Sequence, residues 1–362
     1  MSGAILFGIL IFGLIPKSLN LLNGVNWISN QVGIRFSNYG IAYTNPFSYP
    51  VGDNTSKTNC FSIEVALKPA GYQTKGATFI FSLHDGRDHN QLLMWQYHSW
   101  IIIMNGDDYD HKRGTERIAV DISSMPSKIL LITVTTGEKS TEIYLDGQFV
   151  IRKYFSLKIP NGSKSSLVLG NSVYGRSPWH GDIYGLAFFG YTLTAQDAAL
   201  HFDRWVQNNN FSFVKKEEPF ILYVFDENVG ERVFDHAGGN NNLIIPSRMQ
   251  ILKKTFLFSE NTILRFNRSL FIDSIINILG FIPLGFILSA TFVKIGGTFD
   301  KHNILISVLF CFAVSLSIEI FQAWIPTRNS DILDLIFNTI GALVGATMYR
   351  FLISLINRKR AL

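Results

Sequence analysis

Acidic and amide side chains recur at helical spacing in the most apolar part of the chain, its last quarter. Asp273 and Asn277 lie four residues apart. Ser315, Glu319 and Gln322 follow at steps of four and three. Residues three or four apart share one face of a helix, so each of these two apolar segments has a polar stripe and is otherwise suited to lipid.

A third stripe contains Asp331, Asp334 and Asn338, and Arg328 lies three residues before it. Ionisable side chains inside a membrane are costly, face the interior of the helix bundle and mark a functional or structural site. We therefore expect the three stripes to meet in one group, called the polar cluster below. Its predicted members are Asp273, Asn277, Glu319, Gln322, Arg328, Asp331, Asp334 and Asn338.

The charge balance of the polar cluster allows two interpretations. In the first, its single cation, Arg328, pairs with carboxylates and the amides tie the helices together. In the second, the excess of carboxylates over cations is balanced by a proton or by a divalent cation such as Mg²⁺, which could bridge to a phosphate of a lipid carrier. Two carboxylates could also do acid/base chemistry. We expect no other cofactor, and no hydrolytic triad, because no histidine accompanies Ser315 or Ser317 in the spans.

Three apolar segments must position these stripes, and each is long enough to cross a bilayer, which takes about 20 residues. Gly341 and Gly345 are four apart and permit close helix approach in lipid. Pro283, between two glycines, predicts a kink. The segments cover residues 269–293, 304–325 and 332–356.

The basic residues between and after the spans predict their orientation. Lys294 and Lys301 follow the first span and residues 358–360 are Arg-Lys-Arg, whereas the loop between the second and third spans has Arg328 alone. Cytoplasmic loops carry the excess of Lys and Arg. All three polar stripes are then expected in the outer half of the membrane, with the preceding domain outside the cytoplasm.

The first segment, residues 4–16, is almost wholly apolar and is followed by Lys17. A cleaved signal peptide and a first transmembrane helix over residues 1–22 are both possible, and the missing A-x-A site favours the helix. Both alternatives place the next domain outside the cytoplasm.

The sequence of residues 23–212 predicts an all-β domain. Short β-rich runs recur between turn residues, and Asp146-Gly147 between Tyr144-Leu145 and Gln148-Phe149 is a strong hairpin signal. Many regularly spaced strands predict a jelly-roll sandwich. Thr194 is the expected N-cap of a closing helix over residues 195–207.

The predicted chain is thus a multidomain membrane protein, an all-β jelly-roll sandwich joined to a transmembrane α-helical bundle. The basic residues are scattered and the net charge is only +5, so we expect no nucleic-acid partner. Cys60 and Cys311 are not expected to pair. The predicted parts are an N-terminal helix (1–22), the sandwich (23–212), a short β extension with an amphipathic linker (213–266), the transmembrane helices (267–357) and a basic cytoplasmic tail (358–362).

The order of the β runs resembles the laminin-G or concanavalin A-like lectin fold. The resemblance is carried by IEVALKP from Ile63, EIYLDGQFV from Glu142 and, above all, the late stretch with Trp179, Gly181 and Ile183. Glycanases of that fold need two carboxylates on one strand in a Glu-x-Asp-x-x-Glu pattern, which this sequence lacks. The resemblance therefore implies a binding domain rather than an enzyme.

Two further features of the β domain could bind ligands. The NGDDYD turn at residues 105–110 could hold Ca²⁺, although a solvated turn is the preferred interpretation. Aromatic rings could stack on sugars, although core packing is preferred for most of them. These rings belong to Trp95, Tyr97, Trp100 and Trp179.

The spans resemble the VanZ-like family. The matching pattern is GFIPLGF at 280–286, Glu-x-x-Gln from Glu319, and Arg-x-x-Asp-x-x-Asp-Leu-x-x-Asn-x-x-Gly-Ala-x-x-Gly from Arg328 to Gly345. The founding member of that family is linked to low-level resistance to the glycopeptide teicoplanin.

Together these features predict a multi-pass protein of the bacterial cell (inner) membrane with an extracytoplasmic lectin-like domain. Its expected partners are the lipid bilayer and a cell-envelope glycan or lipid-linked cell-wall precursor, whose binding would affect glycopeptide susceptibility. One alternative is an enzyme that modifies an envelope lipid or glycan with the intramembrane carboxylates. Another is a structural or assembly protein whose polar cluster only holds helices together.

Overall fold

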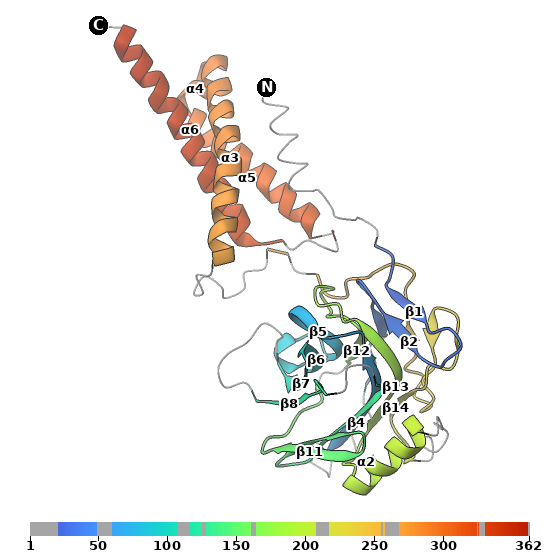
Figure 1. Cartoon of the computed structure of the whole chain (residues 1–362). Coiled ribbons are helices and arrows are strands. Elements are labelled where there is room, and N and C mark those ends of the chain that lie inside the picture. Colours follow the sequence, from blue (N-terminus) through green and yellow to red (C-terminus); the bar gives the residue numbers. More distant parts are fainter. Residues whose placement is uncertain are drawn as a thin grey trace. The chain divides into compact units, whose positions relative to one another are not determined.

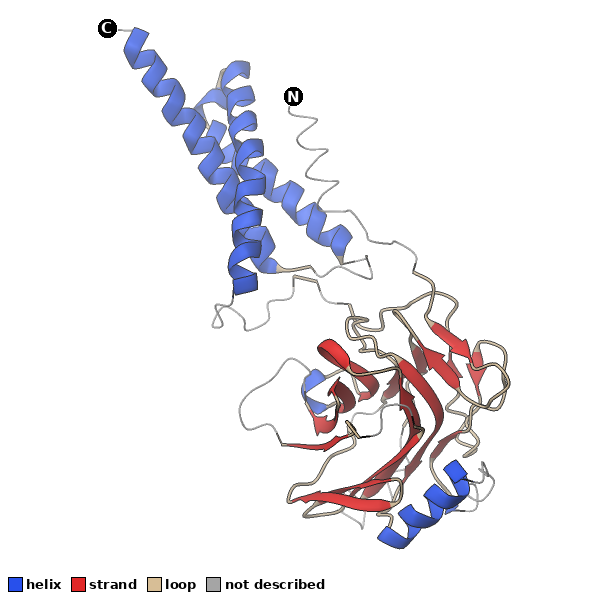
Figure 2. Ribbon diagram, in the orientation of Figure 1, coloured by secondary structure: helices blue, strands red, loops and turns tan. Residues whose placement is uncertain are grey.

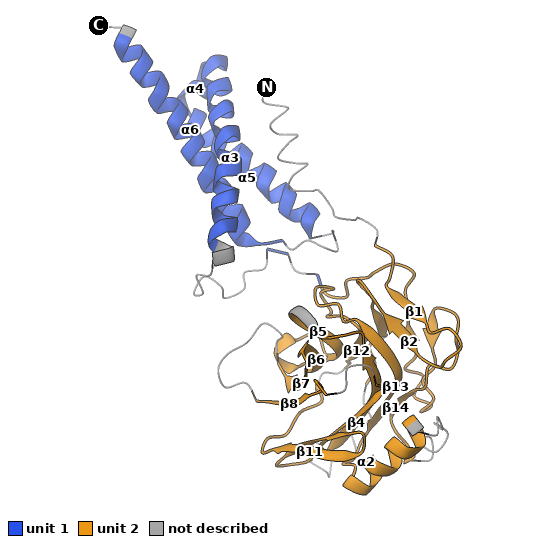
Figure 3. Cartoon of the chain, in the orientation of Figure 1, with its two compact units in different colours: residues 1–19, 254–362 blue, residues 20–253 orange. Residues whose placement is uncertain are grey.

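The computed structural model forms two compact units, residues 20–253 and residues 254–362 together with 1–19 (Figure 3). The predicted first helix, Arg328 and the 107–110 turn fall largely or wholly outside the described part of the chain. The structure describes residues 21–48, 60–106, 116–124, 128–160, 164–207, 217–254, 256–257, 268–323, 325 and 330–360.

The β unit is a sandwich of two eight-stranded sheets (Figure 1). Its named strands pair antiparallel, with β4 between β13 and β9 at the centre of the first sheet. β14 pairs with the other end of β13. In sheet order, the strands are β1 (Val25–Trp27), β2 (Ile34–Phe36), β13 (Gly181–Phe189), β4 (Phe61–Pro69), β9 (Leu130–Thr136), β10 (Thr141–Leu145) and β11 (Gln148–Lys153), with β14 (Ile221–Tyr223) off this path.

The second sheet packs against the first, and the two inner faces form the main apolar core. A short 3-10 helix, η1 (Asp88–Asn90), connects β5 to β6. In sheet order, the strands are β15 (Arg232–Val233), β16 (Leu243–Ile244), β3 (Ala42–Thr44), β12 (Ser166–Leu169), β5 (Gln73–His84), β6 (Leu92–His98), β7 (Trp100–Asn105) and β8 (Arg117–Asp121).

Local signals in the sequence match the elements they predict. Asp146 and Gly147 both have positive φ (50° and 75°), as a two-residue type I′ hairpin between β10 and β11 requires. Thr194 caps α2 (Ala195–His201) in a reciprocal capping box with Asp197. The helical path continues as a π-helical segment, η2 (Phe202–Gln207). Both expectations for this domain are confirmed.

Trp179, just before β13 of the first sheet, contacts β6 of the second sheet. Its side chain is fully buried, and its Nε1 donates to Oε1 of Gln96 at 2.8 Å. A Cβ on Gly181 would overlap the indole ring, so only glycine allows this approach. The residues that suggested the lectin-like fold therefore hold the core together.

The described residues from 217 to 247 add three strands to the sandwich. β14 extends the first sheet, and β15 and β16 extend the second through β3. The chain enters and leaves the β unit side by side, because Leu22 and Arg248 form an antiparallel bridge and Asn23 N donates to the Ser247 carbonyl at 3.2 Å.

The expected amphipathic linker begins inside this β unit. Met249 is buried there, and Lys253 Nζ lies 2.9 Å from Oδ2 of Asp88. The residues just before the helical unit are thus anchored to the sandwich.

The helical unit contains three helices that are long and apolar enough to cross a membrane (Figure 2). Large apolar side chains cover their outer surfaces, as lipid contact requires. α3 continues through Pro283. The described helices are α3 (Arg268–Ile295), the short α4 (Thr298–Lys301), α5 (Asn303–Gln322) and α6 (Ile332–Arg360).

α3 and α6 approach each other closely through glycines. A Cβ on Gly341 would overlap the Ile278 carbonyl, and a Cβ on Gly345 would overlap the Ile282 carbonyl. On α3, a Cβ on Gly285 would meet the backbone of α6. Small residues four apart create this contact in lipid, where packing replaces the hydrophobic effect as the driving force.

Candidate functional site

All three predicted polar stripes contribute to contacts between helices. Asn277 on α3 donates its Nδ2 hydrogen to Oδ1 of Asp334 on α6, with the two atoms 2.6 Å apart. Asn338, one turn after Asp334, donates to Oγ of Ser315 on α5 at 2.9 Å, and both side chains are buried. α6 is therefore bonded to α3 on one side and to α5 on the other.

Glu319 lies at the centre of the described cluster, with only 1% of its surface exposed. Its Oε2 accepts the backbone N–H of Asp331 at 2.9 Å, just before α6 begins. Asp331 in turn accepts the N–H of Leu333 through Oδ1 at 2.8 Å. Two carboxylates thus satisfy backbone donors at the N-terminus of α6, where the helix dipole favours negative charge.

The remaining predicted members differ in position. Gln322 is buried at the end of α5, whereas the Asp273 side chain is exposed on α3, one turn from Asn277. Arg328 lies outside the described residues. The geometry thus brings together Asn277, Asp334, Glu319 and Asp331 with Asn338.

A second buried polar group was missed by the sequence reasoning. Asn303 donates its Nδ2 hydrogen to Oγ of Ser289 at 2.6 Å, and Ser307 Oγ donates to the Asn303 carbonyl at 2.6 Å. The signal was present, because these α5 residues continue the stripe of Ser315 and Glu319 backward at steps of four. The stripe therefore faces the bundle along most of α5.

The β unit has two pockets in its described part that are large enough for a small ligand. The first, called the Trp27 pocket below, has a volume of about 760 Å³. Trp27 is held by a hydrogen bond from its Nε1 to the Gly230 carbonyl at 2.9 Å. The lining of this pocket includes the aromatic rings of Trp27 and Tyr184 and the side-chain amides of Asn30, Gln31 and Asn228.

The second pocket is smaller, about 320 Å³, and is lined by Asn90, Glu116, Phe155 and Lys158 among others. Its Asn105 amide is already used, since Nδ2 donates to the Lys158 carbonyl at 2.7 Å and Oδ1 accepts the Lys158 N–H at 2.7 Å. The Asn105 side chain therefore holds the wall of this pocket through the backbone of Lys158.

The aromatic residues that sequence analysis considered divide into two groups. Trp95 and Trp179 are buried in the cores. Tyr97 and Trp100 are partners across the β6–β7 hairpin, and each is more than two-fifths exposed. Of these four residues, Tyr97 and Trp100 are the two that could offer ring faces to a ligand.

A buried histidine between two carboxylates links the closing helix to the first sheet. Nδ1 of His201 is 2.6 Å from Oε2 of Glu64, and Nε2 is 2.7 Å from Oε2 of Glu217. Burial acts to lower the pKa of His201, but the hydrogen bonds and charges of the two glutamates outweigh it and raise that pKa. The imidazolium therefore stabilises this part of the fold.

Asp88 is an acid of the β unit whose pKa is strongly shifted. Burial acts to raise the pKa of Asp88, but hydrogen bonds from His84, Tyr174 and Lys253 lower it well below its usual range. The Tyr174 hydroxyl donates to Oδ2 at 2.7 Å and Lys253 Nζ donates at 2.9 Å. This acid is fully engaged in anchoring the end of the β unit.

Comparison with protein families gives one match for each half of the chain. Residues 44–199 match the Concanavalin A-like lectin/glucanases superfamily, and residues 219–354 match VanZ/LLP1. The second match begins at β14, so it includes strands that belong to the sandwich as well as the three helices. No curated protein matches this chain.

Several solved structures match part of this chain at low sequence identity. A putative carbohydrate binding protein from Bacteroides ovatus is 14% identical, with 61% of each chain covered and a TM-score of 0.39. The Ruminococcus gnavus IT-sialidase CBM40 bound to alpha2,3 sialyllactose is 10% identical over 48% of this chain and 96% of that one, with a TM-score of 0.34.

The receptor binding domain of botulinum neurotoxin D is a third similar structure. It is 12% identical to this chain, with 52% of each covered and a TM-score of 0.37. The match thus spans about half the length of the neurotoxin domain.

Proposed function

The chain carries a concanavalin A-like lectin domain over residues 44–199 and a VanZ-like membrane domain over residues 219–354, and from this premise we propose that it is a membrane-anchored glycan-binding protein of the bacterial cell envelope. Its ligand class is a cell-envelope glycan or a lipid-linked cell-wall precursor. Binding such a precursor would change the access of glycopeptides such as teicoplanin to it.

The Trp27 pocket is the observation that carries the glycan proposal. A sugar ring offers an apolar face that stacks on an aromatic side chain and hydroxyl groups that pair with amides. The pocket combines Trp27 and Tyr184 with three amide side chains, and its 760 Å³ lies within the range of small-ligand sites, about 300–1,000 Å³. The hydrogen bond from Trp27 to Gly230 holds the indole in place before a ligand arrives.

In the proposed orientation this pocket lies on the extracytoplasmic side of the inner membrane. Support comes from the basic residues Lys294 and Lys301 after α3 and from the Arg-Lys-Arg sequence at 358–360, which the positive-inside rule assigns to the cytoplasmic side. An envelope glycan is accessible only on the opposite side.

For the polar cluster we favour an interhelical network over a ligand site. Asn277 is bonded to Asp334, Asn338 to Ser315, and Glu319 to the backbone N–H of Asp331 just before α6, so α6 shares polar contacts with both α3 and α5. A satisfied network removes the cost of polar groups in lipid without requiring a ligand. The helical unit then anchors the chain in the membrane, and the sandwich binds the envelope glycan.

Binding by the purified full chain in detergent tests the glycan proposal. The probe is the N-acetylglucosamine–N-acetylmuramic acid disaccharide, and affinity is followed by calorimetry. Trp27→Ala and Gln31→Ala should each weaken binding by about fivefold, because a stacked ring and a well-placed hydrogen bond are each worth roughly 1 kcal/mol. Trp100→Ala removes an exposed ring away from the pocket and should leave the affinity unchanged.

Two results would contradict the proposal. One is that the wild-type chain binds neither this disaccharide nor longer cell-wall glycans. The other is that Trp100→Ala abolishes binding while Trp27→Ala, folded as judged by an unchanged melting temperature, does not. The second result would move the site to the β6–β7 hairpin.

A further inference from the structure

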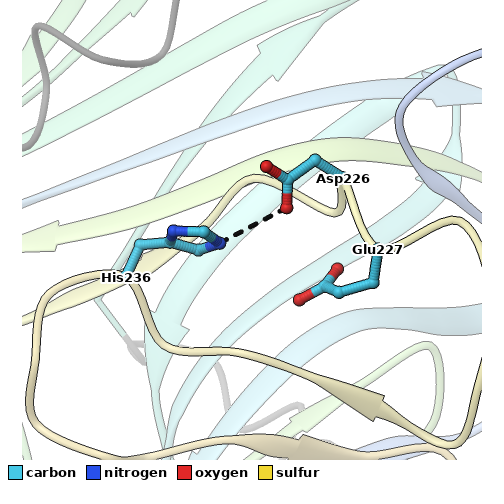
Figure 4. A group of neighbouring side chains, drawn as sticks. All are labelled: Asp226, Glu227 and His236. Atoms are coloured by element: carbon cyan, nitrogen blue, oxygen red, sulfur yellow. Dashed lines mark ion pairs between the residues drawn. The ribbon is translucent and has the colours of Figure 1, made fainter.

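Asp226, Glu227 and His236 meet at the edge of the β unit, outside every site described above. The two acids lie shortly after β14 and His236 lies shortly after β15. Figure 4 shows the three side chains together. One ligand atom from each side chain lies within 4.8 Å of the others. The three residues belong to the stretch that completes the sandwich, and they offer imidazole nitrogen and carboxylate oxygen, two of the donor types that bind Zn²⁺.

Two side-chain atoms of this group are buried without a hydrogen-bond partner among the described residues. These atoms are Oε2 of Glu227 and Nε2 of His236. The nearest carboxylate to the imidazole, Oδ1 of Asp226, is 3.4 Å from Nε2, beyond ordinary hydrogen-bond length. Buried polar atoms are nearly always satisfied, so two buried atoms of one group without a hydrogen bond point to a missing partner.

Both arms of the group are held in place by other bonds. Oε1 of Glu227 accepts the N–H of Phe234 at 2.5 Å, which leaves Oε2 free to face inward. The backbone N–H of His236 donates to the Leu222 carbonyl at 2.8 Å. Asn228 donates its Nδ2 hydrogen to the Asp226 carbonyl at 2.8 Å. A ligand would therefore find its donors already positioned.

We propose that Asp226, Glu227 and His236 bind a divalent transition-metal ion of the Zn²⁺ type. One imidazole and two carboxylates suit such an ion, whereas Mg²⁺ and Ca²⁺ prefer shells made of oxygen alone. The two negative charges balance the ion. The half-exposed Asp226 carboxylate leaves room for water to complete a tetrahedral shell.

The ion would cross-link two chain segments, because each segment would supply at least one of its ligands. Asp226 and Glu227 lie in the loop after β14 of the first sheet, and His236 lies in the loop after β15 of the second sheet. Both segments carry short strands, which have few ladder hydrogen bonds of their own. A metal ligated from both sides would connect the edges of the two sheets, and this inference does not depend on the proposed glycan function.

Metal content of the purified full chain tests the site. The protein, prepared in detergent without a histidine tag, is treated with a chelator, dialysed against Zn²⁺ and analysed by mass spectrometry of the metal. About one equivalent should bind, and His236→Gln or Glu227→Gln should weaken binding by at least about tenfold. His302→Gln replaces an exposed histidine in the helical unit and should bind Zn²⁺ like the wild type.

Thermal unfolding gives the second measurement. Zn²⁺ should raise the melting temperature of the wild type and of His302→Gln, and should leave that of Asp226→Asn and His236→Gln unchanged. Asp226 is exposed, so its asparagine variant keeps the test valid if a change at His236 disturbs folding. The assignment is wrong if the wild type takes up no Zn²⁺, or if the ligand variants bind it with unchanged stoichiometry and affinity.

Discussion

The Asn277 amide donates to the Asp334 carboxylate at 2.6 Å and joins α3 to α6 near the N-terminus of α6. We predict that Asn277→Ala and Asp334→Ala each lower the free energy of unfolding of the helical unit. A double-mutant cycle should give a coupling energy of about 1 kcal/mol, the usual range for a hydrogen bond between transmembrane helices. Unfolding in mixed micelles measures it. Ser317→Ala, which removes only a bond within α5 to Ala313, is the control.

The glycine contacts between α3 and α6 should be intolerant of a single methyl group. Gly345→Ala would push a Cβ into the Ile282 carbonyl and should cost roughly 1–3 kcal/mol of stability. Gly280→Ala is the matched control, because nothing lies within 4 Å of its added Cβ. That variant should be neutral or slightly stabilising, by up to about 1 kcal/mol, since alanine favours helix. Equal effects of both substitutions would contradict the close approach.

His201 should make the stability of the β unit depend on pH. Its pKa is raised in the folded state by Glu64 and Glu217, which outweigh the effect of burial. The stabilisation is therefore complete below the unfolded pKa of about 6.5 and is lost as pH rises through the higher folded pKa.

Chemical denaturation of the full chain at several pH values measures this dependence. The free energy of unfolding should fall above about pH 6.5 in the wild type and fall much less in His201→Asn. Tyr184 and Tyr191, whose pKa values are raised to about 12 chiefly by burial, add their own loss only at more alkaline pH. A profile that is the same in both proteins would exclude the imidazolium as the cause.

The proposed orientation predicts which positions a membrane-impermeant maleimide reaches in spheroplasts. In a chain whose Cys60 is replaced by serine, Tyr154→Cys should be labelled without permeabilisation, because residue 154 is 85% exposed on the β unit. Lys359→Cys should be labelled only after permeabilisation. The opposite pattern would reverse the orientation, and the remaining Cys311 is buried and serves as an unlabelled background.

The two roles assigned to the chain predict different effects on teicoplanin susceptibility. At matched protein abundance, Trp27→Ala should remove the proposed effect of the chain on susceptibility, because it alters the proposed glycan pocket. Glu319→Gln should lower helical stability by about 1 kcal/mol and leave that effect in place. If Glu319→Gln changes susceptibility at normal abundance, the polar cluster binds a ligand and is more than a helix contact.

Signals confined to neighbouring residues predicted their structures well. The Asp146-Gly147 turn depends on positive φ at two adjacent positions, and the Thr194 cap depends on Asp197 three residues later. The apolar spans were equally readable because each helix satisfies its own backbone in lipid. In all these cases the physical cause lies within a few residues of the chain.

Contacts between distant residues could not be predicted in the same way. Glu64 and His201 are 137 residues apart, and nothing in their local sequence indicates that they meet. The polar stripes predicted which faces turn inward, but the pairing of Asn277 with Asp334 depends on how far α3 is shifted along α6. The group of Asp226, Glu227 and His236 was also invisible, since β14 and β15 join different sheets.

The bridge between Leu22 and Arg248 brings the two ends of the sandwich together. Domains whose ends are adjacent can be inserted into a host chain or removed from it with little disturbance to either part. The β unit is therefore a portable module. A chain in which residues 23–247 are replaced by a short Gly-Ser linker should still insert its helices, and a different sandwich could be grafted at the same two points to redirect what the membrane anchor displays.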